Sequence, residues 1–224
     1  MADVQRLHPG TPDDPHVLLA RLDLSVEVLH AALERGFKRA LNRTGAANPG
    51  AQSMDIYQDG SEQLRRLLMR SGWEMVKMPE NQIRIVHPEG RLAIVVASAD
   101  HVGVVGDPKR IPITRPKGPA TTGSLPDKKR ATPEDMLEIP GLPTAPPSVE
   151  ELTQRAPLWM LLHELIGTTL NLELSEALGC REDGRVDKWG ERIQVPPLTA
   201  DDDQSSFDED NGDDDGIDVP VTPR

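Results

Sequence analysis

The apolar segment at residues 157–178 constrains the fold of this chain most, because its periodicity decides between helix and sheet. It reads PLWMLLHELIGTTLNLELSEAL. As a helix it would be long and apolar, whereas the alternation of Leu170, Leu172 and Leu174 is typical of a strand. The Gly-Thr-Thr sequence at 167–169 separates the two halves and suits a tight turn. The pattern favours a β-hairpin, with a single long helix as the alternative.

The N-terminal part of the chain carries a helical pattern. Apolar residues recur at steps of three and four between Leu18 and Ala40, which is the spacing of one helical face. Asp14 can cap such a helix, Pro15 suits its first turn, and Gly45 is placed to end it. The charges on the opposite side are of both signs. We therefore expect one core-packing helix here and not a helix that reads nucleic acid.

A second helix and three short strands are expected between residues 59 and 99. The sequence DGSEQLRRLLMRSG begins with two capping residues, Asp59 and Ser61, and ends at Gly72. The runs WEMVKMP, NQIRIVHP and RLAIVVASA that follow are short and β-rich, and turn sequences separate them. The simplest arrangement is a helix followed by an antiparallel meander.

The length of 224 residues and the distribution of composition indicate one folded domain with polar additions. Residues 1–105 are expected to form the helical N-terminus and the first half of the domain, and residues 106–150 a proline-rich basic linker or arm. Residues 151–200 would supply the remaining strands. Residues 201–224 contain ten Asp or Glu, one Arg and few apolar side chains, which predicts a disordered acidic tail. The predicted fold is α+β, with an antiparallel sheet of about five to six strands and two helices on one face.

The sequence contains no familiar catalytic or metal-binding motif. No two of its six histidines have metal-binding spacing, and His163-Glu164 lacks the second histidine of an H-E-x-x-H motif. Neither glycine-rich phosphate-loop pattern is present. Cys180 is the only cysteine, which argues against an intrachain disulfide or a thiolate-rich zinc site, and its charged surroundings predict a loop. We predict no catalytic residue, no cofactor and no metal site.

The order of a helix and three strands between Ser61 and Ala99 resembles the opening of the restriction-endonuclease-like nucleases. That resemblance implies an acidic residue on the second strand and an E-x-K pair on the third, where carboxylates hold Mg²⁺ and the lysine helps to activate water. The corresponding strands read IRIVH and GRLAIVV, and the sequence from Glu74 to Lys77 has the wrong spacing. The chain thus departs from the nuclease pattern at the metal ligands themselves. A divergent nuclease is therefore only the third function that we consider.

Two segments of opposite charge flank the last strands. The sequence at 201–216 has nine carboxylates in sixteen residues, but it fails the calcium-loop pattern because Thr222 stands at position 12. The arm at 109–130 could follow nucleic-acid phosphates with salt-dependent affinity, and no aromatic residue in it is available for base stacking. The tail could mask the arm until a stronger polyanion displaces it. The candidate binding residues of the arm are Lys109, Arg110, Arg115, Lys117, Lys128, Lys129 and Arg130.

The remaining sequence features bear on compartment and partners. No stretch approaches the roughly 18–20 apolar residues of a membrane span, and the N-terminal sequence lacks the pattern of a signal peptide. The single cysteine fits a reducing compartment, most simply a bacterial cytoplasm. PKGPAT, the apolar segment and WGERIQVPP together resemble a pattern found in proteins of high-GC bacteria and their mobile elements, which implies no activity.

We therefore expect a non-catalytic intracellular binding or accessory protein that acts through protein partners, from a bacterial mobile element or a phage-related locus. The alternative is a nucleic-acid-binding protein that uses residues 109–130 and is autoinhibited by the acidic tail.

Overall fold

The structure, a computed structural model, describes residues 14–78, 81–104, 107, 109–127 and 156–200. Within these ranges the chain has an α+β fold, which confirms the predicted class. The helices are α1 (Pro15–Ala20), α2 (Val26–Leu41), α3 (Ala51–Arg70) and α4 (Pro119–Thr122). The strands are β1 (Glu74–Lys77), β2 (Ile83–Val86), β3 (Ala93–Asp100), β4 (Ile113–Thr114), β5 (Leu158–Ile166), β6 (Thr169–Cys180) and β7 (Val186–Thr199).

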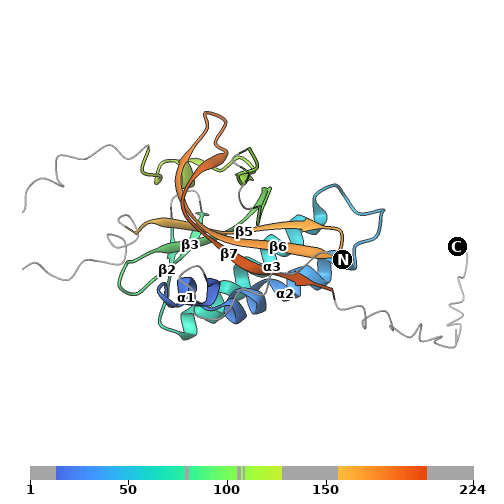
Figure 1. Ribbon diagram of the computed structural model, residues 1–224, viewed down its shortest axis with the longest axis horizontal. Coiled ribbons are helices and arrows are strands. Elements are labelled where there is room, and N and C mark those ends of the chain that lie inside the picture. The colour runs from blue at the N-terminus through green and yellow to red at the C-terminus, as the bar shows by residue number, and fades with distance from the viewer. Residues whose placement is uncertain (1–13, 79–80, 105–106, 108, 128–155, 201–224) are drawn as a thin grey trace, which may run out of the picture.

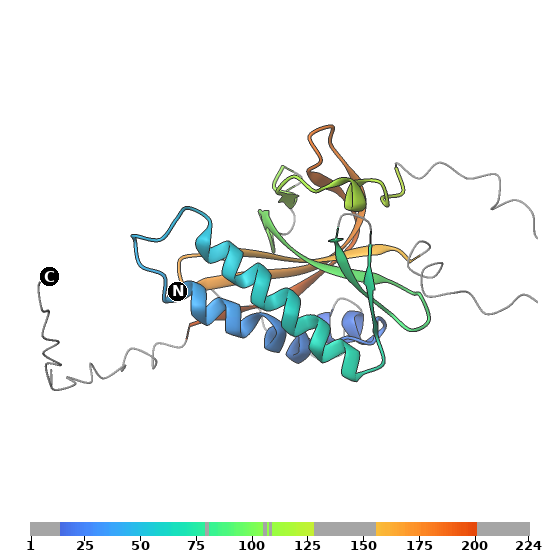
Figure 2. The same ribbon diagram turned by 180° about the vertical axis from the view of Figure 1, so that it is seen from behind.

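All seven strands join one sheet, in the order β1-β2-β3-β5-β6-β7, with β4 paired to the end of β3. Neighbouring strands are antiparallel except β3 and β5, which run parallel and join two meanders. Parallel neighbours require a long crossover connection, and the long connection between β3 and β5 supplies it. Helices α1, α2 and α3 lie on one face of the sheet, and the chain around β4 and α4 lies on the other (Figures 1 and 2).

The segment at 157–178 forms the hairpin that its alternation favours. Strands β5 and β6 pair along their length, and Gly167 occupies the turn with a φ of 59°. Trp159 and Leu161 belong to the core under the helices, whereas Met160 and Leu162 belong to the core on the opposite face. Because both faces of β5 are covered, its apolar run is almost continuous.

The N-terminal apolar stripe is divided between two helices, so the prediction of one helix was wrong. Helix α1 ends at Ala20, and α2 begins after Ser25, whose hydroxyl accepts a hydrogen bond from the Val28 N–H at 3.3 Å. Between them Asp23 has a φ of 55°, which no α-helix can continue through. Both helices still bury apolar side chains in the core under the sheet, such as Leu19 of α1 and Leu29 of α2.

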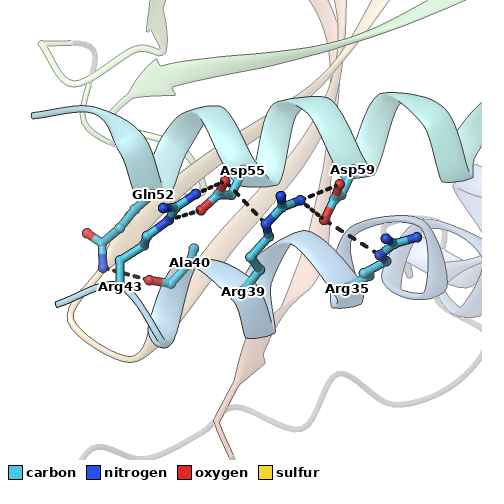
Figure 3. Close-up of polar contacts among 7 residues, drawn as sticks. All are labelled: Arg35, Arg39, Ala40, Arg43, Gln52, Asp55 and Asp59. Carbon is cyan, nitrogen blue, oxygen red and sulfur yellow. Dashed lines mark hydrogen bonds and ion pairs between the residues drawn. The ribbon is translucent and has the colours of Figure 1, made fainter. Parts of the chain in front are cut away.

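Helix α3 begins at Ala51, well before the predicted caps at Asp59 and Ser61. Asp59 lies within the helix and faces α2, where Arg39 donates to both of its carboxylate oxygens at 3.1 Å. Arg43 likewise donates to both oxygens of Asp55, at 2.6 and 2.7 Å (Figure 3). The two aspartates therefore join the helices, and neither is a capping residue.

Glycines allow α2 and α3 to approach closely. A Cβ atom added to Gly36 of α2 would lie 2.8 Å from both the carbonyl oxygen of Asp55 and the Cα of Ile56. One added to Gly60 of α3 would lie 2.5 Å from a methyl group of Leu33. The close approach fixes the position of α3 over the sheet.

Residues 112–124, which we call the outer segment, are bound to the sheet face opposite the helices. The indole N–H of Trp189 donates to the carbonyl oxygen of Pro112 at 2.8 Å. Arg84 of β2 is fully buried and donates to the carbonyl oxygen of Ala120 at 2.7 Å. Part of the expected proline-rich arm is thus packed on the sheet. Residues 106, 108 and 128–150 of the arm and residues 201–224 of the acidic tail lie outside the described residues.

Candidate functional site

A cleft of about 680 Å³ lies between helix α3, strands β2 and β3, and the outer segment. A volume of this size suits a small ligand or a few residues of a peptide. The residues that line it come from five separated parts of the chain, and they include Tyr57, Gln58, Ser61, Glu62, Arg65, Asn81, Gln82, Ile94, Val95, Val96, Ala97, Pro116, Lys117, Gly118, Thr121 and Met160.

The sheet is open where β3 lines this cleft. Strand β2 pairs with β3 only as far as Ile94, and β4 pairs with it only from Ala99 onward. In the described part of the chain, residues 95–98 therefore have no partner strand on this edge, while β5 covers their other edge.

The direction of the open peptide groups follows from strand geometry. The N–H of Ala93 donates to the Pro157 carbonyl oxygen at 2.9 Å, on the β5 side. Alternate residues of a strand direct their main-chain groups to opposite edges, so the N–H groups of Val96 and Ser98 face away from β5, toward the open edge. An open strand edge is a template for pairing with another extended chain.

Lys117 supplies a cation to the wall of the cleft. Its main chain is held by a hydrogen bond from its N–H to the Gly184 carbonyl oxygen at 3.0 Å. Among the described residues, no carboxylate forms an ion pair with its ammonium group. Burial lowers the pKa of Lys117 to about 8, so the side chain is mostly charged at neutral pH and loses its proton more readily than an ordinary lysine.

The other charges of the cleft leave it net positive. Arg65 lines it and, like Lys117, has no ion pair with any described residue. Glu62 is the carboxylate of the lining, and it pairs at 3.4 Å with Arg66, which lies outside the lining. The cleft therefore favours an anionic group, although the whole chain carries a net charge of −12.

His163 of β5 lies beside a second hollow of about 490 Å³, which follows the first along α3 and β3. Its side chain is 1% exposed, and its Nε2 atom has no hydrogen-bond partner among the described residues. Burial, and secondarily the charge of Lys117, lower the pKa of His163 to about 4. The imidazole is therefore neutral at pH 7, and Lys117 lies near enough to influence it.

The predicted cationic residues have different surroundings. Lys109 and Arg110 are exposed and line neither hollow. Arg115 is also exposed, forms an ion pair with Asp100 at 3.5 Å and borders the second hollow. Lys117 lines the cleft. Lys128, Lys129 and Arg130 lie outside the described residues.

Other titratable groups are engaged in structural contacts. Glu173 is fully buried and accepts hydrogen bonds from Arg192 at 2.6 and 2.8 Å. Glu164 accepts one from the N–H of Val102 at 2.9 Å. Cys180 is buried at the end of β6, so its predicted loop position was wrong. Within the described ranges, no three His, Cys, Asp or Glu side chains lie together in a way that could hold a metal ion.

Comparisons with protein-family models, with curated proteins and with solved structures found no match to this chain. None of the helices in the described ranges combines the length and apolar character needed to cross a membrane. The chain's own geometry is therefore the basis for inferring its function.

Sequence reasoning did not identify Tyr57, Ser61, Gln82 or the β3 edge as parts of a site. These residues become neighbours only when α3, β2 and the outer segment pack together. One local sequence feature could have pointed to Lys117. It lies in a Pro-Lys-Gly-Pro sequence at 116–119, whose prolines limit the conformations of the chain around it.

Proposed function

We propose that this chain is a non-catalytic binding protein that acts through a protein partner, holding an extended segment of that partner in the cleft. The open edge of β3 at residues 95–98 carries the proposal. Addition of a strand to such an edge gives affinity through main-chain hydrogen bonds, and the surrounding side chains give specificity. At about 3.3 Å per residue the open edge extends roughly 13 Å, enough for about four residues of a partner.

The rim of the cleft supports this function. Tyr57 is 45% exposed although it is large and apolar, and it lines the cleft beside Gln58 and Ser61. Tyrosine is enriched among the residues that contribute most binding energy in protein interfaces, because its ring packs while its hydroxyl group hydrogen-bonds. The same helix carries other exposed apolar side chains, and one of them, Met69, lies outside the cleft and serves as a matched control.

The test is a selection of eight-residue peptides displayed on phage, followed by measurement of dissociation constants for the synthetic peptides. We expect Tyr57→Ala to weaken the selected peptides about tenfold or more, as loss of an interface anchor does, and Met69→Ala to leave them unchanged. Equal effects of the two substitutions on every selected peptide would contradict binding in the cleft.

A nucleic-acid-binding protein is the second candidate, favoured by the exposure of Lys109, Arg110 and Arg115. A gel-shift with and without the triple substitution of Lys128, Lys129 and Arg130 to Ala tests it, since lost phosphate contacts weaken binding and flatten its salt dependence.

The third candidate, a divergent nuclease, requires Mg²⁺-dependent cleavage by the purified protein.

A further inference from the structure

We propose that the extended segment held in the cleft carries a carboxylate, and that Lys117 is the cation that binds it. The inference rests on the proposed function, because it names the chemistry of the ligand that occupies the same cleft. Its basis is the combination of the open β3 edge with an ammonium group that lacks a carboxylate partner in the described part of the chain.

Charge complementarity favours an acidic ligand. The cleft presents the cations Lys117 and Arg65, while its carboxylate, Glu62, is already paired with Arg66. A neutral or basic segment entering the cleft would leave Lys117 further desolvated and still without a counter-ion, which costs free energy. A segment with an Asp or Glu side chain would supply the missing partner.

The main chain at Lys117 is held in place before any ligand arrives. Its N–H is bonded to the Gly184 carbonyl oxygen, and the chain that follows it is held by the bond from Arg84 to Ala120. Apolar side chains such as Val96 and Met160 share the lining, so water is partly displaced around the ammonium group. Attraction between opposite charges is stronger in such surroundings than in bulk water, and a cation carried on an ordered main chain loses less entropy on binding than one on a mobile segment.

The pH dependence of binding gives this inference a specific signature. Among the described residues, the titratable and charged groups that line the cleft with Lys117 are Tyr57, Glu62 and Arg65 on α3, and the charge of Lys117 also acts on His163 of β5. Of these, His163 is already neutral above a pKa of about 4, whereas the pKa of Lys117 is about 8. Affinity for an acidic peptide should therefore be constant near pH 7 and fall as Lys117 loses its proton at higher pH.

The test compares each selected acidic peptide with versions in which Asp or Glu is replaced by Asn, Gln or phosphoserine. Fluorescence anisotropy gives the affinities for the wild type, Lys117→Met, Lys117→Arg and a control, Lys109→Met, which alters an exposed lysine outside the cleft. We expect the wild type and the control to prefer the carboxylate about tenfold over the amide, as for one charge-assisted pair. Lys117→Met should lose that preference.

Lys117→Arg separates a role in binding from a role in folding. An arginine keeps its charge at all accessible pH values, so this variant should retain the preference for carboxylates and lose the fall in affinity above pH 8. A wild-type affinity that is equal for acid and amide peptides would overturn the inference while leaving peptide binding in the cleft intact.

Three other results would each lead to a different conclusion. Tighter binding of the phosphoserine peptides would assign the cleft to phosphorylated segments and overturn the carboxylate assignment. If phage selection yields acidic peptides only on a chain that lacks residues 201–224, the chain's own acidic segment is the occupant, and the assignment to a partner's carboxylate is overturned. Peptides insensitive to Tyr57→Ala would instead refute the proposed function itself.

Discussion

Asp55 and Asp59 lie in the α2–α3 interface with side chains that are only 7% and 10% exposed, while the arginines that pair with them reach solvent. Arg43, through its hydrogen bonds, holds the pKa of Asp55 below its usual value, despite the opposing effect of burial. The charge of Arg39 acts in the same direction. The ionised form of Asp55 is therefore the form that stabilises the fold.

This arrangement predicts how stability depends on pH. Because the pKa of Asp55 is lowered in the folded state, its contribution is present above the unfolded value of about 3.9 and is lost as pH falls through the folded value. Asp55→Asn should thus be less stable than the wild type at pH 7, and the difference should shrink below about pH 4. Urea unfolding at a series of pH values measures this difference, and a gap that persists unchanged to pH 2 would contradict the prediction.

The local sequence around Asp59 shows why some residue roles could not be predicted. An Asp followed by Gly and Ser before an apolar run is a normal helix cap, and nothing nearby distinguishes it from a residue inside a helix. Its actual partner, Arg39, comes from another helix. Lys117 is a similar case, since its sequence neighbours predict a solvated arm and the cleft forms only by packing.

The contact between α2 and α3 depends on Gly36, and this predicts the effect of adding one methyl group. Gly36→Ala places a Cβ 2.8 Å from two backbone atoms of α3, which cannot move without shifting the helix. We expect a loss of about 1–3 kcal/mol, as is typical of overpacking, in spite of the higher helix propensity of Ala. Gly45→Ala is the control, because a Cβ there meets nothing within 4 Å. Equal unfolding midpoints for the two variants would refute the close packing.

Arg84 holds the outer segment, and its replacement tests that attachment. Burial lowers the pKa of Arg84 to about 10, so it remains charged at pH 7. Its acceptors among the described residues are neutral oxygens, including those of Ala120 and Ser124. Arg84→Met should leave these oxygens without their donor and cost about 1–3 kcal/mol. Amide exchange should accelerate in residues 118–125 in particular. An unchanged exchange pattern there would contradict the attachment, and Arg70→Met on exposed α3 surface is the control.

Elements with strong local signals were predictable from the sequence. The hairpin of β5 and β6 follows from alternation and a Gly-containing turn, and the meander of β1, β2 and β3 from short β-rich runs between turn residues. The break at Asp23 was not predictable, because the apolar stripe continues across it in the same register. Nor was the parallel pairing of β3 with β5, which joins segments on either side of the proline-rich region.

Most of the net negative charge of the whole molecule lies in the residues that follow the folded domain. Residues 201–224 account for about −9 of the net charge of −12, which leaves about −3 for residues 1–200. The described domain is therefore nearly neutral, and its cleft is locally positive. Net charge alone would predict a cationic ligand, whereas the charges that line the cleft favour an anionic one.

If the acidic tail masks the basic arm, its removal should strengthen nucleic-acid binding most at low salt, where attraction between charges is least screened. Deletion of residues 201–224, with DNA affinity measured by gel-shift across a salt series, tests this prediction. An unchanged affinity at low salt would contradict autoinhibition. A chain that keeps residues 201–224 with its Asp and Glu replaced by Asn and Gln separates charge from length.

Amide hydrogen exchange of the whole protein, with and without a selected peptide, tests strand addition to β3 most directly. The N–H groups of Val96 and Ser98 face the open edge, so a peptide that pairs with β3 should slow their exchange markedly. Ala93, already bonded to Pro157, should change little and provides the internal reference. Tight peptide binding with no added protection at Val96 and Ser98 would contradict the account.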